Sequence, residues 1–171
     1  MADLRKQRTN LLIFTSFAKL LCQKPFSKIT VAEIVSTAMI HRNTFYQHFV
    51  DKYELLRFFI NKVIQDSDFS IEDFKKAPFS TINDALVREQ TQIFRAQDDD
   101  IEFNRIARDT FVRSFITKNN DNYDIIWEFG TLASILAWSD VSGANLTFFN
   151  DANLLDEIYR TKKFPQKNIR K

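Results

Sequence analysis

Apolar positions in the first part of the chain recur at steps of three and four residues, the spacing of one face of a helix. The pattern predicts a helix over residues 4–24. Pro25 disfavours helical geometry in the residue before it, so the helix is expected to end there. The apolar face of this helix consists of Leu11, Phe14, Ala18 and Leu21.

Two short helices are expected next. In the segment ITVAEIVSTA, Thr30 is a suitable cap, and Glu33 can reach back to it as the second half of a capping box. The following helix should begin close to His41, which leaves little chain for the turn between them. Two short helices with so tight a joint predict a helix-turn-helix over residues 30–49.

The rest of the chain also favours helices. Asp51, with Glu54 as its box partner, starts a helix that continues to about Ile64. The polar region that follows contains Pro78 and is expected to be a linker with a short helix over residues 71–76. Further helices are expected over residues 81–97, 100–118, 122–139 and 151–163.

Turn-forming residues are scarce, with 2 Gly and 3 Pro among 171 residues. Sheet-rich folds need more of them, so the composition favours an all-α fold of long helices. We place a domain boundary near residue 65, which divides an N-terminal domain (1–65) from a second helical domain (66–171).

Charge is distributed unevenly, although the net charge is only +2. Residues 1–65 carry +6, residues 66–159 carry −10 and residues 160–171 carry +6. A basic first third followed by an acidic body suggests that the first part contacts a polyanion. Two differently solvated faces would produce the same distribution.

Cysteine and hydropathy indicate the cellular setting. Cys22 is the only cysteine, which excludes an intrachain disulfide and fits a reducing cytoplasm, and its apolar surroundings favour a place in the core. No apolar stretch has the length of a membrane span, so we expect a cytoplasmic protein without a membrane partner.

The run TFYQHFVDKYELL (44–56) combines an aromatic-Tyr pair, a His-Phe pair, an Asp-Lys pair and an acidic-Leu pair at a distinctive spacing. Together with Pro25-Phe26, ITVAEIV and AMIHRNTFYQHF, it makes residues 10–64 resemble the N-terminal DNA-binding domain of the TetR (tetracycline repressor) family. The resemblance implies a three-helix DNA-binding domain followed by a helical domain for ligand binding and dimerisation.

Polar groups at the start of the second motif helix are candidates for base contacts. A helix that enters the major groove needs small polar or basic side chains near its N-terminal end. Arg42 can pair with guanine and Asn43 with adenine, each worth about 1–3 kcal/mol of discrimination. A plain solvated charge is the alternative for Arg42. The base-contact candidates are His41, Arg42, Asn43 and Thr44.

Phosphate contacts require hydroxyls, amides and cations. The resemblance to the TetR family implies that two of the phosphate candidates, Tyr46 and Lys52, hold the DNA backbone. Packing within the motif is the alternative for Tyr46 and His48, and it is the expected role of Phe45 and Phe49. The phosphate candidates are Thr30, Thr44, Tyr46, Gln47, His48 and Lys52.

Two positions depart from the family pattern. Most members have Gly in the turn, where this chain has Met39, and a left-handed residue there costs about 1–2 kcal/mol without glycine, so a rearranged turn is expected. His41 replaces the usual capping hydroxyl and is a poor cap.

The C-terminal part is expected to supply regulation and dimerisation. The resemblance implies a dimer formed by the last two long helices, and small residues on the helix over 122–139 suit close packing, either within the subunit or across the dimer axis. The 18 Phe residues can line a pocket for a small apolar or aromatic effector, or fill a core. The pocket candidates are Phe94, Phe103, Phe111, Phe115 and Trp127.

The function expected from the sequence is a homodimeric DNA-binding repressor that an effector releases from a palindromic double-stranded operator. A regulator or activator of the same fold controlled by a protein partner is the alternative. We find no motif for catalysis, and neither a metal nor a cofactor is expected. The acidic run at residues 98–100 is expected to be a solvated helix start.

Overall fold

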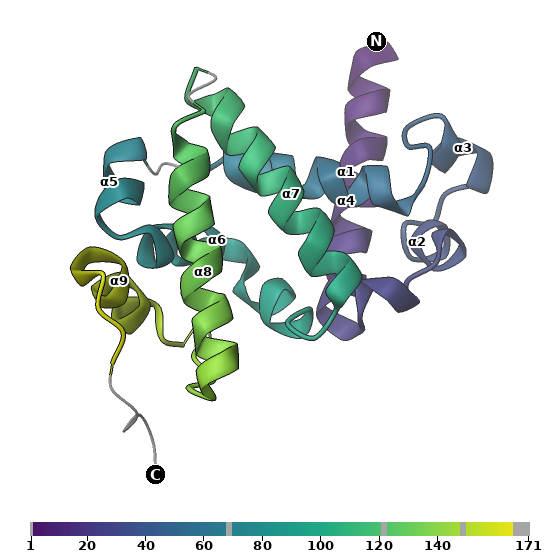
Figure 1. The fold of residues 1–171 in the computed structure, drawn as a ribbon. Coiled ribbons are helices and arrows are strands. Elements are labelled where there is room, and N and C mark those ends of the chain that lie inside the picture. Colours follow the sequence, from purple (N-terminus) through teal and green to yellow (C-terminus); the bar gives the residue numbers. More distant parts are fainter. Residues whose placement is uncertain (1, 68–69, 121–122, 148–149, 166–171) are drawn as a thin grey trace. The chain divides into compact units, whose positions relative to one another are not determined.

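The computed structural model describes residues 2–67, 70–120, 123–147 and 150–165, and all regular elements within them are helices (Figure 1). The all-α prediction is confirmed. The elements are α1 (Ala2–Gln23), the 3₁₀ helix η1 (Phe26–Lys28), α2 (Val31–Thr37), α3 (Arg42–Tyr46), α4 (Lys52–Gln65), α5 (Ile71–Lys76), α6 (Pro78–Ala96), α7 (Ile101–Lys118), α8 (Ile125–Ser142) and α9 (Ala152–Thr161).

Helix starts follow the capping chemistry of the sequence. At α4 the Glu54 N–H donates to Asp51 Oδ1 at 2.7 Å, as predicted, whereas the Glu54 carboxylate accepts from the N–H of Val50 at 2.6 Å. Helix α6 begins three residues before the predicted start, because Pro78 fits the first helical position and lacks the N–H that would stay unbonded there. The carboxylate of Asp156 accepts from the next two N–H groups, of Phe79 at 2.8 Å and Ser80 at 3.0 Å.

The predicted buried face of α1 is partly wrong. Leu11 is 62% exposed, whereas Ile13, Phe17 and Leu21 are fully buried. Several faces of α1 are apolar, so spacing alone does not select the buried one. The expectation that Cys22 lies in the core is also wrong, because this residue is exposed.

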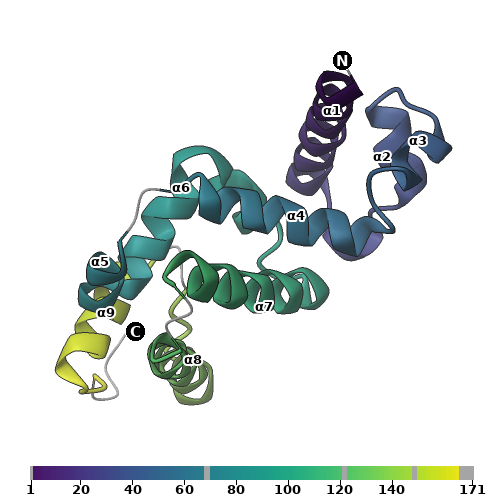
Figure 2. The ribbon, with the colours of Figure 1, turned by 90° about the horizontal axis from the view of Figure 1, so that it is seen from above.

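The first compact unit consists of residues 1–63 and 90–111. Within it α1 packs against α2, and α2 packs against α3, as Figures 1 and 2 show. Its core is aromatic, with ring centroids 6.1 Å apart for Phe17 and Phe59 and 6.2 Å for Phe17 and Phe26. The predicted domain boundary near residue 65 did not anticipate that residues 90–111 belong to the first unit.

The second compact unit consists of residues 64–89 and 112–171. Phe74 of α5 lies 4.8 Å from Phe115 of α7 and 5.1 Å from Phe129 of α8, measured between ring centroids. Helix α9 packs against α8, where the Tyr159 hydroxyl donates to Glu128. Burial, and then this carboxylate, raise the pKa of Tyr159. An aromatic cluster and one polar contact therefore join α5, α7, α8 and α9.

The turn between α2 and α3 keeps a left-handed residue despite the missing glycine. Met39 has a φ of 53° and is 90% exposed. Its N–H donates to Ser36 O at 3.2 Å, and the Ile40 N–H donates to Val35 O at 3.0 Å, the two bonds of a Schellman motif. The expected rearrangement is therefore wrong, because these bonds hold Met39 in the strained conformation.

Met39→Gly is expected to raise the free energy of unfolding by about 0.5–1 kcal/mol, because glycine relieves the left-handed strain at some cost in chain entropy. Urea denaturation measures the change. Ala32→Gly, at an exposed helical position of α2, is the matched control and should lower stability by about 1 kcal/mol. A loss of stability in Met39→Gly would contradict the strain argument.

Candidate nucleic-acid interface

Helix α3 divides its residues between a buried and an exposed side. Phe45 is fully buried and Phe49, just after the helix, is 6% exposed, with their ring centroids 5.9 Å apart. Their expected core role is confirmed. The residues that the structure leaves exposed are His41, Arg42, Asn43, Tyr46 and Gln47, and Thr44 is half-buried.

Two of the exposed side chains of α3 contact each other. Arg42 Nη2 donates to the Tyr46 hydroxyl at 3.2 Å, and the guanidinium lies 5.6 Å from the centroid of the Tyr46 ring. The contact aligns a cation and a phenol along one turn of the helix. At the start of α3, His41 makes no side-chain capping bond, which confirms the expectation of a poor cap.

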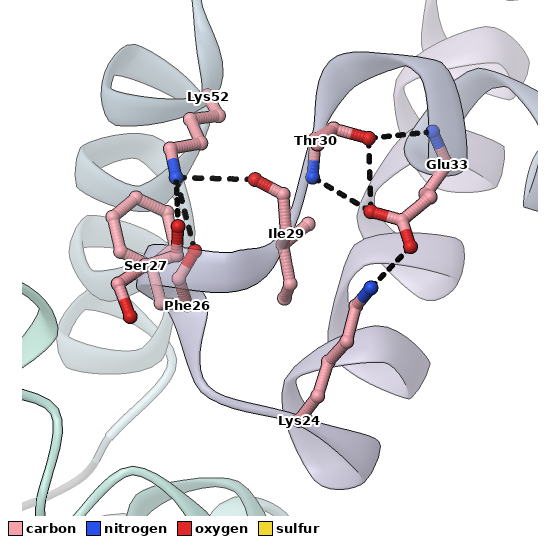
Figure 3. A network of polar contacts seen from close by, with 7 residues as sticks. All are labelled: Lys24, Phe26, Ser27, Ile29, Thr30, Glu33 and Lys52. Atoms are coloured by element: carbon pink, nitrogen blue, oxygen red, sulfur yellow. Dashed lines mark hydrogen bonds and ion pairs between the residues drawn. The ribbon is translucent and has the colours of Figure 1, made fainter.

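The start of α2 is held by a complete capping box, as predicted (Figure 3). The Glu33 N–H donates to Thr30 Oγ1 at 3.3 Å, and the Thr30 N–H donates to Glu33 Oε2 at 2.9 Å. Lys24 pairs with the other carboxylate oxygen. Its ammonium, followed by the bonds from Thr30, lowers the pKa of Glu33 to about 2. Thr30 is exposed, and its hydroxyl donates to Glu33 Oε2 at 2.9 Å.

His48 faces α1. Its Nδ1 lies 2.6 Å from Oδ1 of Asn10. Burial, and then the charge of Lys6, lower the pKa of His48, which favours the neutral ring at pH 7. With an oxygen acceptor at Nδ1, that nitrogen carries the proton and Nε2 has none to donate. The arrangement supports a packing role for His48 rather than a phosphate contact.

Lys52 is directed at the backbone that precedes α2 (Figure 3). Its Nζ donates to the carbonyl oxygens of Phe26, Ser27 and Ile29 at 3.0, 3.2 and 3.1 Å. It also lies 4.5 Å from the centroid of the Phe26 ring. An ammonium group has three N–H donors, so these carbonyls use its full donor capacity.

The pocket candidates occupy different surroundings. Phe94 and Phe103 are buried in the first unit with ring centroids 5.7 Å apart, and Phe111 is 8% exposed there. Phe115 is fully buried in the second unit, whereas Trp127 on α8 is 79% exposed. The four Phe residues are therefore packed as core residues, whereas Trp127 is largely exposed, and an apolar effector pocket stays a prediction.

A concave site of the second unit is lined mainly by charged and polar residues. It is an open cleft of about 1040 Å³ between the end of α5, the start of α6 and α9, and Asp156 and Glu157 also line it. Its cationic lining residues are Lys75, Lys76, Arg160 and Lys162. Although the surrounding segment is acidic, the cleft thus gathers positive charge.

Sequence reasoning missed Gln97 and the structural use of Asp100. Asp100 is only 6% exposed, so the expectation of a solvated start at residues 98–100 is wrong for this residue. It does start α7, since its Oδ1 accepts from the Phe103 N–H at 2.9 Å. No local pattern marks Gln97, which is fully buried.

Two further properties concern only the described residues. Among them, no group of three or more His, Cys, Asp or Glu side chains is arranged to hold a metal ion. No helix formed by these residues is long and apolar enough to cross a membrane.

Comparison with known proteins agrees with this geometry. Residues 15–57 match the sequence model described as "Bacterial regulatory proteins, tetR family", a segment that runs from α1 into α4 and includes α2 and α3. No curated protein matched the chain. The residues of the exposed α3 face lie inside the matched segment. The chain therefore carries a TetR-type helix-turn-helix domain near its N-terminus, and the protein is a DNA-binding transcriptional regulator.

Proposed function

We propose that the protein is a cytoplasmic, homodimeric repressor that binds a palindromic operator through α3 and is released from it by an effector. The exposed face of α3 supports this proposal most directly. It presents Arg42 and Asn43, side chains that can contact base edges, while the aromatic side of the helix is buried. Tyr46 is exposed beside Arg42, and its hydroxyl is a group that can contact a phosphate.

A face of α8 that consists mainly of small and apolar residues supports dimerisation. Ile126 and Val141 are 49% and 90% exposed, and they flank exposed small residues at helical spacing. The Ser134 hydroxyl donates back to Gly130 O at 2.9 Å, so it is satisfied within the helix. Among the described residues, no atom outside the neighbouring backbone lies within 4 Å of the position where a Gly130 Cβ would stand. A second copy of α8 can approach this face closely.

Two subunits also suit the target. A single α3 reaches only a few base pairs, whereas two related helices about 34 Å apart read two half-sites of a palindrome. The TetR resemblance implies a four-helix interface made by the last two long helices of each subunit, and α8 is one of these long helices.

The cationic cleft supports an anionic effector. Lys75 and Lys76 meet Arg160 and Lys162 around an opening large enough for a small organic molecule. The effector must favour a state in which the two α3 helices no longer match successive grooves. The alternative is control by a protein partner. The same cleft is open to solvent and could receive an acidic protein segment, which favours this alternative. Release of the operator by protein-free metabolite extract would separate the two.

Selection of bound duplexes from a random pool is expected to yield a palindromic site. Arg42→Ala should relax one position in each half-site, at a cost of about 1–3 kcal/mol for the preferred base. Arg57→Ala, which removes an exposed cation from α4, is the control and should leave the consensus unchanged. An unchanged consensus in the Arg42 variant would remove this residue from base readout.

Lys52→Met is expected to weaken operator binding without changing the slope of log affinity against log salt. The ammonium is used by three carbonyls, so its loss acts through the position of α2 rather than through a phosphate. Fluorescence anisotropy over a series of salt concentrations measures both quantities. A fall in the slope by about 0.9 would instead place Lys52 on a phosphate.

Ala133→Arg is expected to convert the dimer into a monomer, because a buried unpaired charge at a closely packed helix contact is strongly unfavourable. Sedimentation at micromolar concentration measures the mass. Thr117→Arg, at an exposed position of α7, is the matched control and should remain dimeric. A monomeric wild-type protein would exclude the dimer, and a dimeric Ala133→Arg would exclude this face as the interface.

A further inference from the structure

The turn between α6 and α7 (residues 97–100, hereafter the α6–α7 turn) contacts the segment that leads into α2. We call this segment, residues 24–30, the connector. The fully buried amide of Gln97 bonds to it from both ends. Nε2 donates to Lys24 O at 2.9 Å, and also to Leu21 O at 2.6 Å, while Oε1 accepts from the Phe26 N–H at 2.7 Å.

Asp100 binds the connector and starts α7 with the same carboxylate. Its Oδ2 accepts from the Ser27 N–H at 2.7 Å, and its Oδ1 accepts from the Phe103 N–H at 2.9 Å. Burial on its own raises the pKa of Asp100, but these N–H groups outweigh it and hold the pKa below its ordinary value. The group is therefore ionised at neutral pH, and its bonds are of the stronger, charge-assisted kind.

The first turn of α7 adds apolar and polar contacts to the same region. The rings of Phe103 and Phe26 lie 6.4 Å apart between centroids. The Tyr53 hydroxyl, at the start of α4, donates to Glu102 Oε1 at 3.1 Å. The start of α7 thus contacts both the connector and the helix that supplies Lys52.

The connector has few backbone bonds of its own. Within it, the Lys28 N–H donates to Pro25 O and the Ile29 N–H donates to Phe26 O, both at 3.0 Å. The N–H groups of Phe26 and Ser27 are instead bound by side chains of the α6–α7 turn. Three carbonyls of the connector are bound by Lys52, as Figure 3 shows. The connector ends at Thr30, the cap of α2, so its position sets where the helix-turn-helix begins.

We propose that the α6–α7 turn positions the helix-turn-helix on the DNA, with Gln97 and Asp100 as positioning residues that touch no nucleotide. A change in α6 or α7 then reaches α2 and α3 through these bonds and alters operator affinity. The inference rests on the operator binding proposed above and adds the place from which that binding is controlled.

The test uses the full-length variants Asp100→Asn and Gln97→Met. Asp100→Asn removes the negative charge and replaces one of the two acceptor oxygens with an NH2 donor. Gln97→Met removes the hydrogen-bond partner of the connector groups at nearly constant side-chain volume. Asp99→Asn, which removes a charge from an exposed neighbour in the same turn, is the matched control. Circular dichroism establishes a temperature at which every variant is fully folded, so global unfolding does not contribute to the measured differences in exchange and affinity.

Two measurements are made at that temperature. Hydrogen exchange of peptides that cover the connector should be about ten-fold faster in both variants than in the control, since an unmade buried bond lowers local protection. Operator affinity should fall about ten-fold with an unchanged salt slope, because no phosphate contact is lost.

The outcomes separate this inference from the proposed function. Unchanged exchange and affinity in both variants would overturn the positioning role, and so would faster exchange with unchanged affinity, which marks a purely structural bond. If the wild-type protein binds no duplex while exchange still responds to Asp100→Asn, operator binding fails and the link between the turn and the connector stands.

Discussion

The structure of the DNA-binding part depends on how the backbone of the connector is satisfied. Pro25 ends α1, and the short 3₁₀ helix after it leaves N–H and carbonyl groups that no regular element bonds. Buried backbone groups without partners are costly, so these groups require donors and acceptors from elsewhere in the chain. Lys52 supplies the donors, and Gln97 with Asp100 supplies acceptors and further donors. The place of α2, and hence of α3, follows from side chains far from it in the sequence.

Helix α3 is only five residues long and depends on the rest of the domain for its stability. Isolated helices of this length are unstable in water, so its shape must come from packing. Phe45 and Phe49 supply that packing on the buried side, and the Schellman turn at Met39 fixes its entry. The opposite side is then free to carry Arg42 and Asn43 into solvent, where a duplex is the complementary partner for the basic first third of the chain.

The second unit carries the two features that support the proposed regulation. The face of small and apolar residues of α8 around Ala133 suits a second copy of the chain, which would place two α3 helices on one operator. The cationic cleft at the start of α6 suits an anionic ligand. Helix α6 begins beside this cleft, where the Asp156 carboxylate accepts from the N–H groups of Phe79 and Ser80.

Local chemistry in the sequence was sufficient for most helices, for the capping box at Thr30 and for the core roles of Phe45 and Phe49, because these depend on neighbours within a few residues. The TetR resemblance likewise lies within one contiguous segment, which the family comparison confirms. The buried face of α1, the exposure of Cys22 and the engagement of Lys52 were decided only by tertiary packing. The same holds for Gln97, whose partners lie in α1 and the connector. No spacing along the chain encodes such long-range bonds, since they exist only once distant backbone groups are brought together and deprived of water.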